Sequence, residues 1–201
     1  MVSLNMARIL VSGVSGPIGT ALLPSLKSNG AHISRLTREN SKHAGEEDPQ
    51  ISWDPAQPVS PEAVSGFDAV IHLAGESIVG RWTEVKKKAI RDSRVKGTTH
   101  LAHALAAAKD KPQVFICGSA IGYYGDRGAE VLNEQSAPGT GFLSEVCAEW
   151  EAAARPAASA GIRTVLMRTG IVLSPKGGAL GKMVTPFQWG VGGASEVASS
   201  G

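Results

Sequence analysis

At 201 residues the chain can bury one well-packed core, with little left for a second lobe. Its apolar fraction of 42% is ordinary for a globular protein, and a net charge of +2 is too small to indicate binding to nucleic acid or to a membrane surface. No apolar run approaches the ~20 residues that span a bilayer, and the first eight residues do not resemble a secretion signal. Cys117 lies in an apolar strand pattern and Cys147 in a helical one, which suggests free thiols in a reducing compartment. We therefore expect a soluble, cytoplasmic protein.

Short apolar runs alternate with helical patterns along the whole chain. Strands are predicted over Arg8–Ser12, His32–Thr37, Ile51–Trp53, Ala69–Ala74, Val114–Gly118 and Arg163–Arg168. Helices are predicted over Thr20–Asn29, Glu84–Ser93, Val95–Ala108 and Ser144–Ala160. Several strands are nearly continuous runs of Val, Ile and Leu, which is typical of parallel strands covered on both faces. The alternation predicts an α/β fold, a Rossmann-type doubly wound parallel sheet with helices on both faces.

The stretches between these elements predict connectors rather than domain boundaries. Glu39–Pro49 is polar and charged and is expected to form a surface loop, and the proline-bearing stretch Pro55–Pro61 is another connector. Residues 194–201 are small and polar, which predicts a disordered or non-native tail. We therefore expect one nucleotide-binding domain over residues 1–193.

Three glycines follow the first strand with the spacing G-x-x-G-x-x-G. Gly13 permits a tight turn, Gly16 lets backbone approach a diphosphate without an intervening Cβ, and Gly19 lets the next helix pack closely on the strand. The helix N-terminus would then present unpaired N–H groups and the positive end of its dipole to the phosphates. The motif predicts a dinucleotide site formed by Gly13, Ser15, Gly16, Pro17, Ile18 and Gly19.

The second strand predicts which dinucleotide is bound. In an NAD site an acidic residue about 20 positions beyond the glycines accepts hydrogen bonds from the ribose 2′-hydroxyl. Here the strand ends in Thr37-Arg38, and a guanidinium with a neighbouring hydroxyl suits a 2′-phosphate. We therefore expect NADP(H) rather than NAD(H), with Arg35 as the alternative cation and Glu39 as a complicating charge.

Several further segments carry a family resemblance: His72-Leu73-Ala74-Gly75, Val95-Lys96-Gly97-Thr98, Ser119 through Gly125, and Arg168 through Leu173. With them the chain resembles the extended short-chain dehydrogenase/reductases, and more specifically the atypical branch known as epimerase family proteins. The resemblance implies NADP(H) as cofactor, with Leu73, Ala74 and Gly75 beside the adenosine and Val172 near the nicotinamide. It also implies a homodimer formed through the two long helices. Extended members run to roughly 300 residues, so we expect the C-terminal substrate lobe to be largely missing.

The same resemblance implies that the usual catalytic residues are absent. The positions of the family's Tyr, Lys and Ser/Thr fall on Leu143, Cys147 and Ala120, and Arg94 replaces a helix Asn. Leucine cannot transfer a proton, and a neutral thiol cannot act as the ammonium does. Ser119 and Tyr123 are the candidate replacements, while Arg94 is expected to serve cofactor binding as a cation near the diphosphate or nicotinamide ribose.

Two functions therefore remain open from the sequence. The first is an atypical NADP(H)-dependent oxidoreductase or epimerase-like protein acting on a carbonyl or alcohol of an unidentified small molecule. The second is a non-catalytic NADP(H)-binding redox sensor, and a truncated product without function is a third interpretation. His100 and His103 share a helix face, but no cluster completes a metal site, so no metal is expected. Neither nucleic acid nor membrane is an expected partner.

Overall fold

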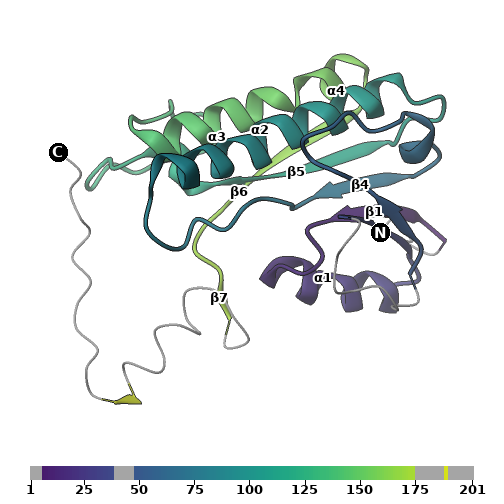
Figure 1. The fold of residues 1–201 in the computed structure, drawn as a ribbon, viewed down its shortest axis with the longest axis horizontal. Helices are drawn as coiled ribbons and strands as arrows, with labels where there is room; N and C mark the ends of the chain where they lie inside the picture. Colours follow the sequence, from purple (N-terminus) through teal and green to yellow (C-terminus); the bar gives the residue numbers. More distant parts are fainter. Residues whose placement is uncertain (1–5, 39–47, 175–187, 190–201) are drawn as a thin grey trace. The chain divides into compact units, whose positions relative to one another are not determined.

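Six parallel strands form the centre of the fold, in the order β3-β2-β1-β4-β5-β6 (Figure 1). The structure, a computed structural model, describes residues 6–38, 48–174 and 188–189. The chain divides into two units, Met1–Gly170 and Ile171–Gly201. The strands of the sheet are β1 (Arg8–Ser12), β2 (His32–Thr37), β3 (Gln50–Ser52), β4 (Ala69–His72), β5 (Val114–Ala120) and β6 (Arg163–Thr169). The predicted doubly wound parallel sheet is confirmed.

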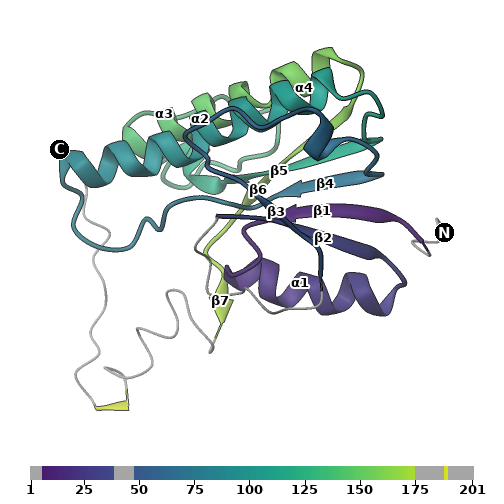
Figure 2. The same ribbon diagram turned by 45° about the vertical axis from the view of Figure 1, so that its right-hand side comes forward.

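Helices cover both faces of this sheet, as Figures 1 and 2 show. Helix α1 (Pro17–Ser28) lies on one face, and α2 (Glu84–Ala107), α3 (Phe142–Ala153) and α4 (Arg155–Ser159) lie on the other. Short 3-10 turns, η1 (Glu62–Val64) and η2 (Ile121–Tyr124), precede β4 and follow β5. The strand order reverses direction between β1 and β4, because the chain winds outward to β3 on one side and to β6 on the other. Ligands of open α/β sheets bind at the carboxyl ends of strands at such a reversal.

The alternation of side chains along β1 divides the core into two clusters. Ile9 and Val11 point toward α1 and pack with Leu23, whereas Leu10 points toward α2 and packs with Leu101. All of these side chains are buried. Because β1 is covered on both faces, an unbroken apolar run is what its position requires.

Three helix boundaries differ from the predicted ones. Helix α1 begins at Pro17 rather than Thr20, because proline suits the first helical turn, where no N–H is needed. Helix α2 is one continuous helix of 24 residues rather than two. Its internal Gly97 packs so closely on Trp53 and Pro55 that an added Cβ would lie 3.3–3.4 Å from them. The predicted helix Ser144–Ala160 is instead split into α3 and α4 at Ala154, ahead of Pro156, whose ring and missing N–H interrupt the helix.

The strand bounds also shift by one or two residues. Strand β4 ends at His72 rather than Ala74, and β5 and β6 each extend beyond the predicted ends, to Ala120 and Thr169. In the second unit the structure describes β7 (Leu173–Ser174) and residues 188–189. The predicted tail over 194–201, the domain limit at 193 and most of the loop Glu39–Pro49 lie outside the described residues. Within the described ranges, no helix is both long and apolar enough to cross a bilayer.

Candidate functional site

The turn after β1 passes closely under the segment that follows β4. Gly13 adopts a φ of 73°, and a Cβ added to it would lie 2.5 Å from the carbonyl carbon of Leu73. A Cβ on Gly19 would lie equally close to the Gly13 carbonyl oxygen, at 2.5 Å. Glycine is therefore required at both positions, by the left-handed backbone at Gly13 and by the close approach of α1 at Gly19.

The N-terminus of α1 opens directly beside this turn. Gly16 is the residue that precedes the helix, so no side chain caps it, and the first turn carries no acidic residue. Such an end leaves N–H groups without intrahelical acceptors and concentrates positive partial charge. A bound anion would accept hydrogen bonds from these N–H groups and would be attracted by the positive partial charge.

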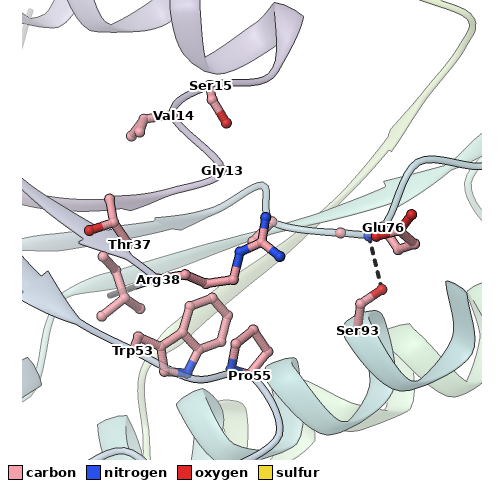
Figure 3. A pocket seen from close by; sticks show the side chains of 12 residues that line it. Gly13, Val14, Ser15, Thr37, Arg38, Trp53, Pro55, Glu76 and Ser93 are labelled. Atoms are coloured by element: carbon pink, nitrogen blue, oxygen red, sulfur yellow. Dashed lines mark hydrogen bonds between the residues drawn. The ribbon is translucent and has the colours of Figure 1, made fainter. Parts of the chain in front are cut away.

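A first hollow of about 170 Å³ lies on the β2 side of the Gly13 turn. Its lining residues come from the ends of β1, β2, β3 and β4 and from α2: Gly13, Val14, Ser15, Leu36, Thr37, Arg38, Trp53, Pro55, Ala74, Gly75, Glu76 and Ser93. Figure 3 shows the Arg38 side chain directed into the hollow, with the rings of Trp53 and Pro55 to one side of it. No described residue hydrogen-bonds to or ion-pairs with this guanidinium.

The neighbouring polar residues of β2 are already bound within the protein. Arg35 is buried, and its guanidinium holds Asp48, with Nε 2.8 Å and Nη2 2.6 Å from Oδ2. The Thr37 hydroxyl donates to Gln50 Oε1 at 3.3 Å. Arg35 is therefore not available as the alternative cation, whereas Arg38 has no hydrogen-bond or ion-pair partner among the residues that the structure describes.

A second hollow of about 120 Å³ lies on the β5 side of the same turn. It is lined by Gly13, Gly16, Pro17, Ile18, Gly19, Leu73, Gly118, Ser119, Trp150, Met167 and Thr169. The Trp150 indole lies against Gly118, where an added Cβ would come within 3.3 Å of the ring. The two hollows share Gly13 and lie on either side of the β1 turn, so an extended ligand can cross from one to the other.

A charged network closes the β5 and β6 end of the sheet. Arg168 forms a bidentate pair with Glu151, with Nε 2.7 Å from Oε1 and Nη2 2.9 Å from Oε2. The Ser119 hydroxyl donates to Glu151 Oε1 at 2.6 Å, and Arg168 Nη1 donates to the Tyr124 hydroxyl at 2.9 Å. The Arg168 guanidinium also lies 3.5 Å from the centroid of the Tyr123 ring.

The electrostatics of this network keep both partners charged. Burial opposes ionisation of Glu151, but the hydrogen bonds from Arg168 and Ser119 outweigh it and hold the pKa of that carboxyl below its usual value. The pKa of Arg168 is raised, first by its hydrogen bond to Glu151. Because the hydrogen of Ser119 is directed at Glu151, it does not point at the second hollow.

Leu143 and Cys147 lie next to each other on α3 and both face the start of η2. A Cβ on Gly122 would lie 3.5 Å from Leu143 Cβ and 3.8 Å from Cys147 Sγ. Burial raises the pKa of the Cys147 thiol, which Arg94 partly counteracts. Leu143 carries no ionisable group, and the raised pKa of Cys147 keeps its thiol neutral.

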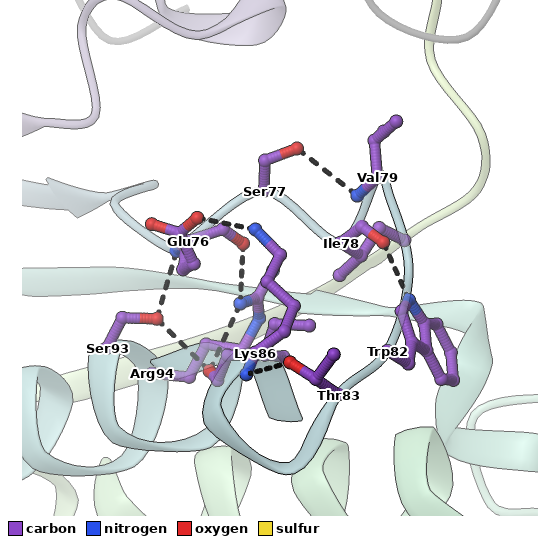
Figure 4. A network of polar contacts seen from close by, with 10 residues as sticks. Glu76, Ser77, Ile78, Val79, Trp82, Thr83, Lys86, Ser93 and Arg94 are labelled. Carbon is purple, nitrogen blue, oxygen red and sulfur yellow. Dashed lines mark hydrogen bonds and ion pairs between the residues drawn. The ribbon is translucent and has the colours of Figure 1, made fainter. Parts of the chain in front are cut away.

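Behind the first hollow, the segment after β4 is held by a second polar network (Figure 4). The Glu76 carboxylate pairs with Lys86 at 2.6 Å, and its backbone N–H donates to Ser93 Oγ at 2.9 Å. Arg94 Nη1 donates to the carbonyl oxygens of Glu76, at 2.9 Å, and Ile90, at 3.2 Å. These contacts fasten the segment between β4 and α2 to the first turns of α2.

A third, fully buried chain of polar groups runs beneath the site. His72 Nδ1 lies 2.6 Å from Ser12 Oγ, and its Nε2 lies 3.1 Å from Thr98 Oγ1. Trp150 Nε1 donates to the same Thr98 oxygen at 2.9 Å. Burial lowers the pKa of His72 to about 4, so the ring is neutral at pH 7. These hydrogen bonds connect Ser12, the last residue of β1, to α2 and α3.

Most of the predicted cofactor-binding residues line one hollow or the other. Arg94 lines neither hollow and instead donates hydrogen bonds to the carbonyl oxygens of Glu76 and Ile90. Val172 belongs to the second unit, so its contact with a nicotinamide stays a prediction. The sequence reasoning missed Trp53, Pro55 and Ser93 in the first hollow and Trp150 in the second. Trp53 directly follows β3, and in a parallel sheet the residue after each strand faces the ligand edge, so this signal was present. Within the described ranges, no group of three or more His, Cys, Asp or Glu side chains is placed to hold a metal ion.

Comparison with known proteins gives consistent matches. A family model described as the NAD dependent epimerase/dehydratase family matches residues 9–187. An epimerase family protein of Mycobacterium bovis is 39% identical over 188 residues, which cover 92% of this chain and 60% of that protein. The human epimerase family protein SDR39U1 is 35% identical over 191 residues, which cover 92% of this chain and 61% of the relative. The chain thus spans about 60% of the length of these curated relatives.

Two solved structures superpose on most of the chain. A nucleoside-diphosphate sugar epimerase from Corynebacterium glutamicum matches with a TM-score of 0.80 at 36% identity, covering 98% of this chain and 40% of that one. Human epimerase family protein SDR39U1, crystallised with NADPH, matches with a TM-score of 0.78 at 33% identity, covering 92% of this chain and 61% of that one.

Proposed function

The chain belongs to the NAD dependent epimerase/dehydratase family, and from this premise we propose that it binds NADP(H) across the carboxyl edge of its sheet. The adenosine occupies the first hollow, the diphosphate lies on the N-terminus of α1, and the nicotinamide half occupies the second hollow. The human relative that was crystallised with NADPH supports this choice of coenzyme.

The observation that carries the proposal is the unpaired guanidinium of Arg38 in the first hollow. A 2′-phosphate is doubly charged and offers oxygens for two parallel hydrogen bonds, whereas a 2′-hydroxyl offers a single neutral group. Each charge-assisted hydrogen bond contributes about 1.5–3 kcal/mol. Within the described residues, no acidic side chain stands at the end of β2, where other Rossmann domains carry the residue that selects NAD, and Glu39 lies outside the described residues.

Calorimetric titration with NADPH and NADH tests this assignment. The wild-type chain is expected to bind NADPH at least tenfold more tightly, and Arg38→Ala is expected to abolish most of that difference while leaving NADH binding nearly unchanged. Arg163→Ala is the matched control, because Arg163 is an exposed arginine at the opposite, amino-terminal end of β6. An NADPH preference that survives Arg38→Ala would refute the role of Arg38.

For the reaction, we propose an atypical oxidoreductase or epimerase-like protein in which hydride passes between the nicotinamide and a carbonyl or alcohol substrate. In this proposal, Ala120 stands in place of the family's Ser or Thr, Leu143 in place of its Tyr, and Cys147 in place of its Lys. Tyr123 and Ser119 remain the candidate replacements for proton transfer.

A second candidate function is a non-catalytic sensor of the NADP(H) redox state. It is favoured by the network at the end of β5, where Ser119 donates to Glu151 and the Tyr124 hydroxyl accepts from Arg168. These contacts direct both hydroxyl groups into the protein's own charge network. Single-turnover reactions of bound NADPH with a panel of aldehydes and ketones separate the two functions, since oxidation of the bound cofactor by any of them excludes a purely binding role.

A further inference from the structure

We propose that Arg94 makes this site discriminate between the two redox states of its cofactor, binding NADPH more tightly than NADP⁺. The inference rests on the proposed function, because it requires the nicotinamide half of the cofactor to occupy the second hollow. It goes beyond that function by assigning to one residue a preference for the reduced form.

The position of Arg94 places a positive charge behind the second hollow. The guanidinium carbon lies 5.1 Å from the centroid of the Trp150 ring, and Trp150 lines that hollow against Gly118. On its other side the guanidinium lies 3.2 Å from the position of a Cβ on Gly75, which lines the first hollow. Arg94 therefore lies behind both hollows, against one lining residue of each, Trp150 and Gly75.

The immediate partners of Arg94 leave its charge without a dedicated counter-ion. Within the described residues, its hydrogen bonds go to two neutral carbonyl oxygens, those of Glu76 and Ile90. The Glu76 carboxylate attracts Arg94 from nearby but is itself paired with Lys86 at 2.6 Å.

The other ionisable groups at this end do not cancel that charge. Glu151 is held by Arg168 in a bidentate pair. Cys147, the remaining ionisable neighbour of Arg94, is a buried thiol whose pKa is raised, so it stays neutral. Burial lowers the pKa of Arg94 itself, yet a guanidinium in a protein remains protonated at neutral pH. Among the described residues, no carboxylate thus forms an ion pair with Arg94.

This charge acts differently on the two forms of the cofactor. NADP⁺ carries a positive charge on its pyridinium ring, and NADPH carries none there, while the rest of the molecule is the same. The Trp150 ring would attract the pyridinium through a cation–π contact, but the Arg94 guanidinium lies 5.1 Å from the centroid of the same ring and its charge opposes that attraction. A repulsion of about 1.4 kcal/mol between the two positive charges is enough to change an affinity about tenfold.

Calorimetric titration of the chain with NADPH and with NADP⁺ gives the quantity to be tested. This quantity is the dissociation constant of NADP⁺ divided by that of NADPH. The wild-type ratio is expected to favour NADPH about tenfold. Arg94→Gln keeps a hydrogen-bond donor but removes the charge, so its ratio is expected to fall toward one, chiefly through tighter binding of NADP⁺. Arg94→Lys keeps the charge and is expected to keep a clear preference for NADPH.

Two further variants make the test specific. Arg38→Ala is expected to weaken both forms by the same factor and to leave the ratio unchanged, because the 2′-phosphate is common to both. Glu76→Gln removes the nearest carboxylate and leaves Lys86 uncompensated, so it is expected to raise the ratio, and this holds as a test even if Arg94→Gln does not fold. Equal wild-type affinities, or a ratio unmoved by both Arg94→Gln and Glu76→Gln, would overturn the inference. Failure of both cofactors to bind would instead overturn the proposed function.

Discussion

The buried His72 ring is expected to make the fold sensitive to acid in a pH window of its own. The side chain is fully buried, lies between the Trp53 and Phe115 rings, and has hydroxyl groups rather than charges at both nitrogens. Burial lowers its pKa from 6.5 to about 4. In the unfolded chain the same ring accepts a proton near pH 6.5, so below that pH protonation favours unfolding. The contribution of neutral His72 to the free energy of unfolding is fully present above pH 6.5 and is lost as the pH falls toward 4. The loss amounts to about 3 kcal/mol, at ~1.4 kcal/mol per pKa unit.

Urea unfolding followed by tryptophan fluorescence at several pH values between 7.5 and 4.5 measures this loss. His72→Gln cannot titrate, so its stability, although lower at pH 7, is expected to stay nearly flat across the window. His103→Gln is the matched control, since His103 is exposed on α2 and its replacement should leave the wild-type slope intact. The carboxyl groups of Glu151 and Asp48 have lowered pKa values and contribute only at lower pH. Equal slopes for wild type and His72→Gln would show that the reasoning is wrong.

Two further predictions concern the turn after β1 and the charged network. Gly13→Ala is expected to cost about 3 kcal/mol or more and to abolish cofactor binding, because it combines a left-handed φ of 73° with a clash against the segment after β4. Gly128→Ala, with a φ of 55° and open space around it, should cost only about 1 kcal/mol, and chemical denaturation that finds equal costs would contradict the clash. Glu151→Ala and Arg168→Ala are each expected to cost about 3 kcal/mol, because each strands a partly buried charge. Their double variant should cost about 2 kcal/mol less than the sum, and additive costs in a double-mutant cycle would exclude the pairing.

Parts of the fold and site were predictable because their signals are local. The apolar run of β1 and the glycines after it require a buried strand, a tight turn and a closely packed helix, and these follow from backbone sterics alone. The alternation of strand and helix patterns predicted the parallel sheet in the same way. Helix boundaries were less accurate: the break expected between Ser93 and Val95 is absent from α2, and the helix predicted over Ser144–Ala160 is split ahead of Pro156.

The sequence by itself therefore determined the Rossmann-type sheet, the glycine turn after β1 and the arginine at the end of β2, since each depends on residues close together in the chain. Only the tertiary structure decided which charges are free. Arg35 and Arg38 are alike in sequence, yet Asp48 binds the first and leaves the second open. Glu151 and Arg168, or Arg94 and Trp150, meet only because β5, β6, α2 and α3 converge at one edge. Electrostatic pairing depends on distances of a few ångströms between side chains far apart in the chain, and no local pattern encodes those distances.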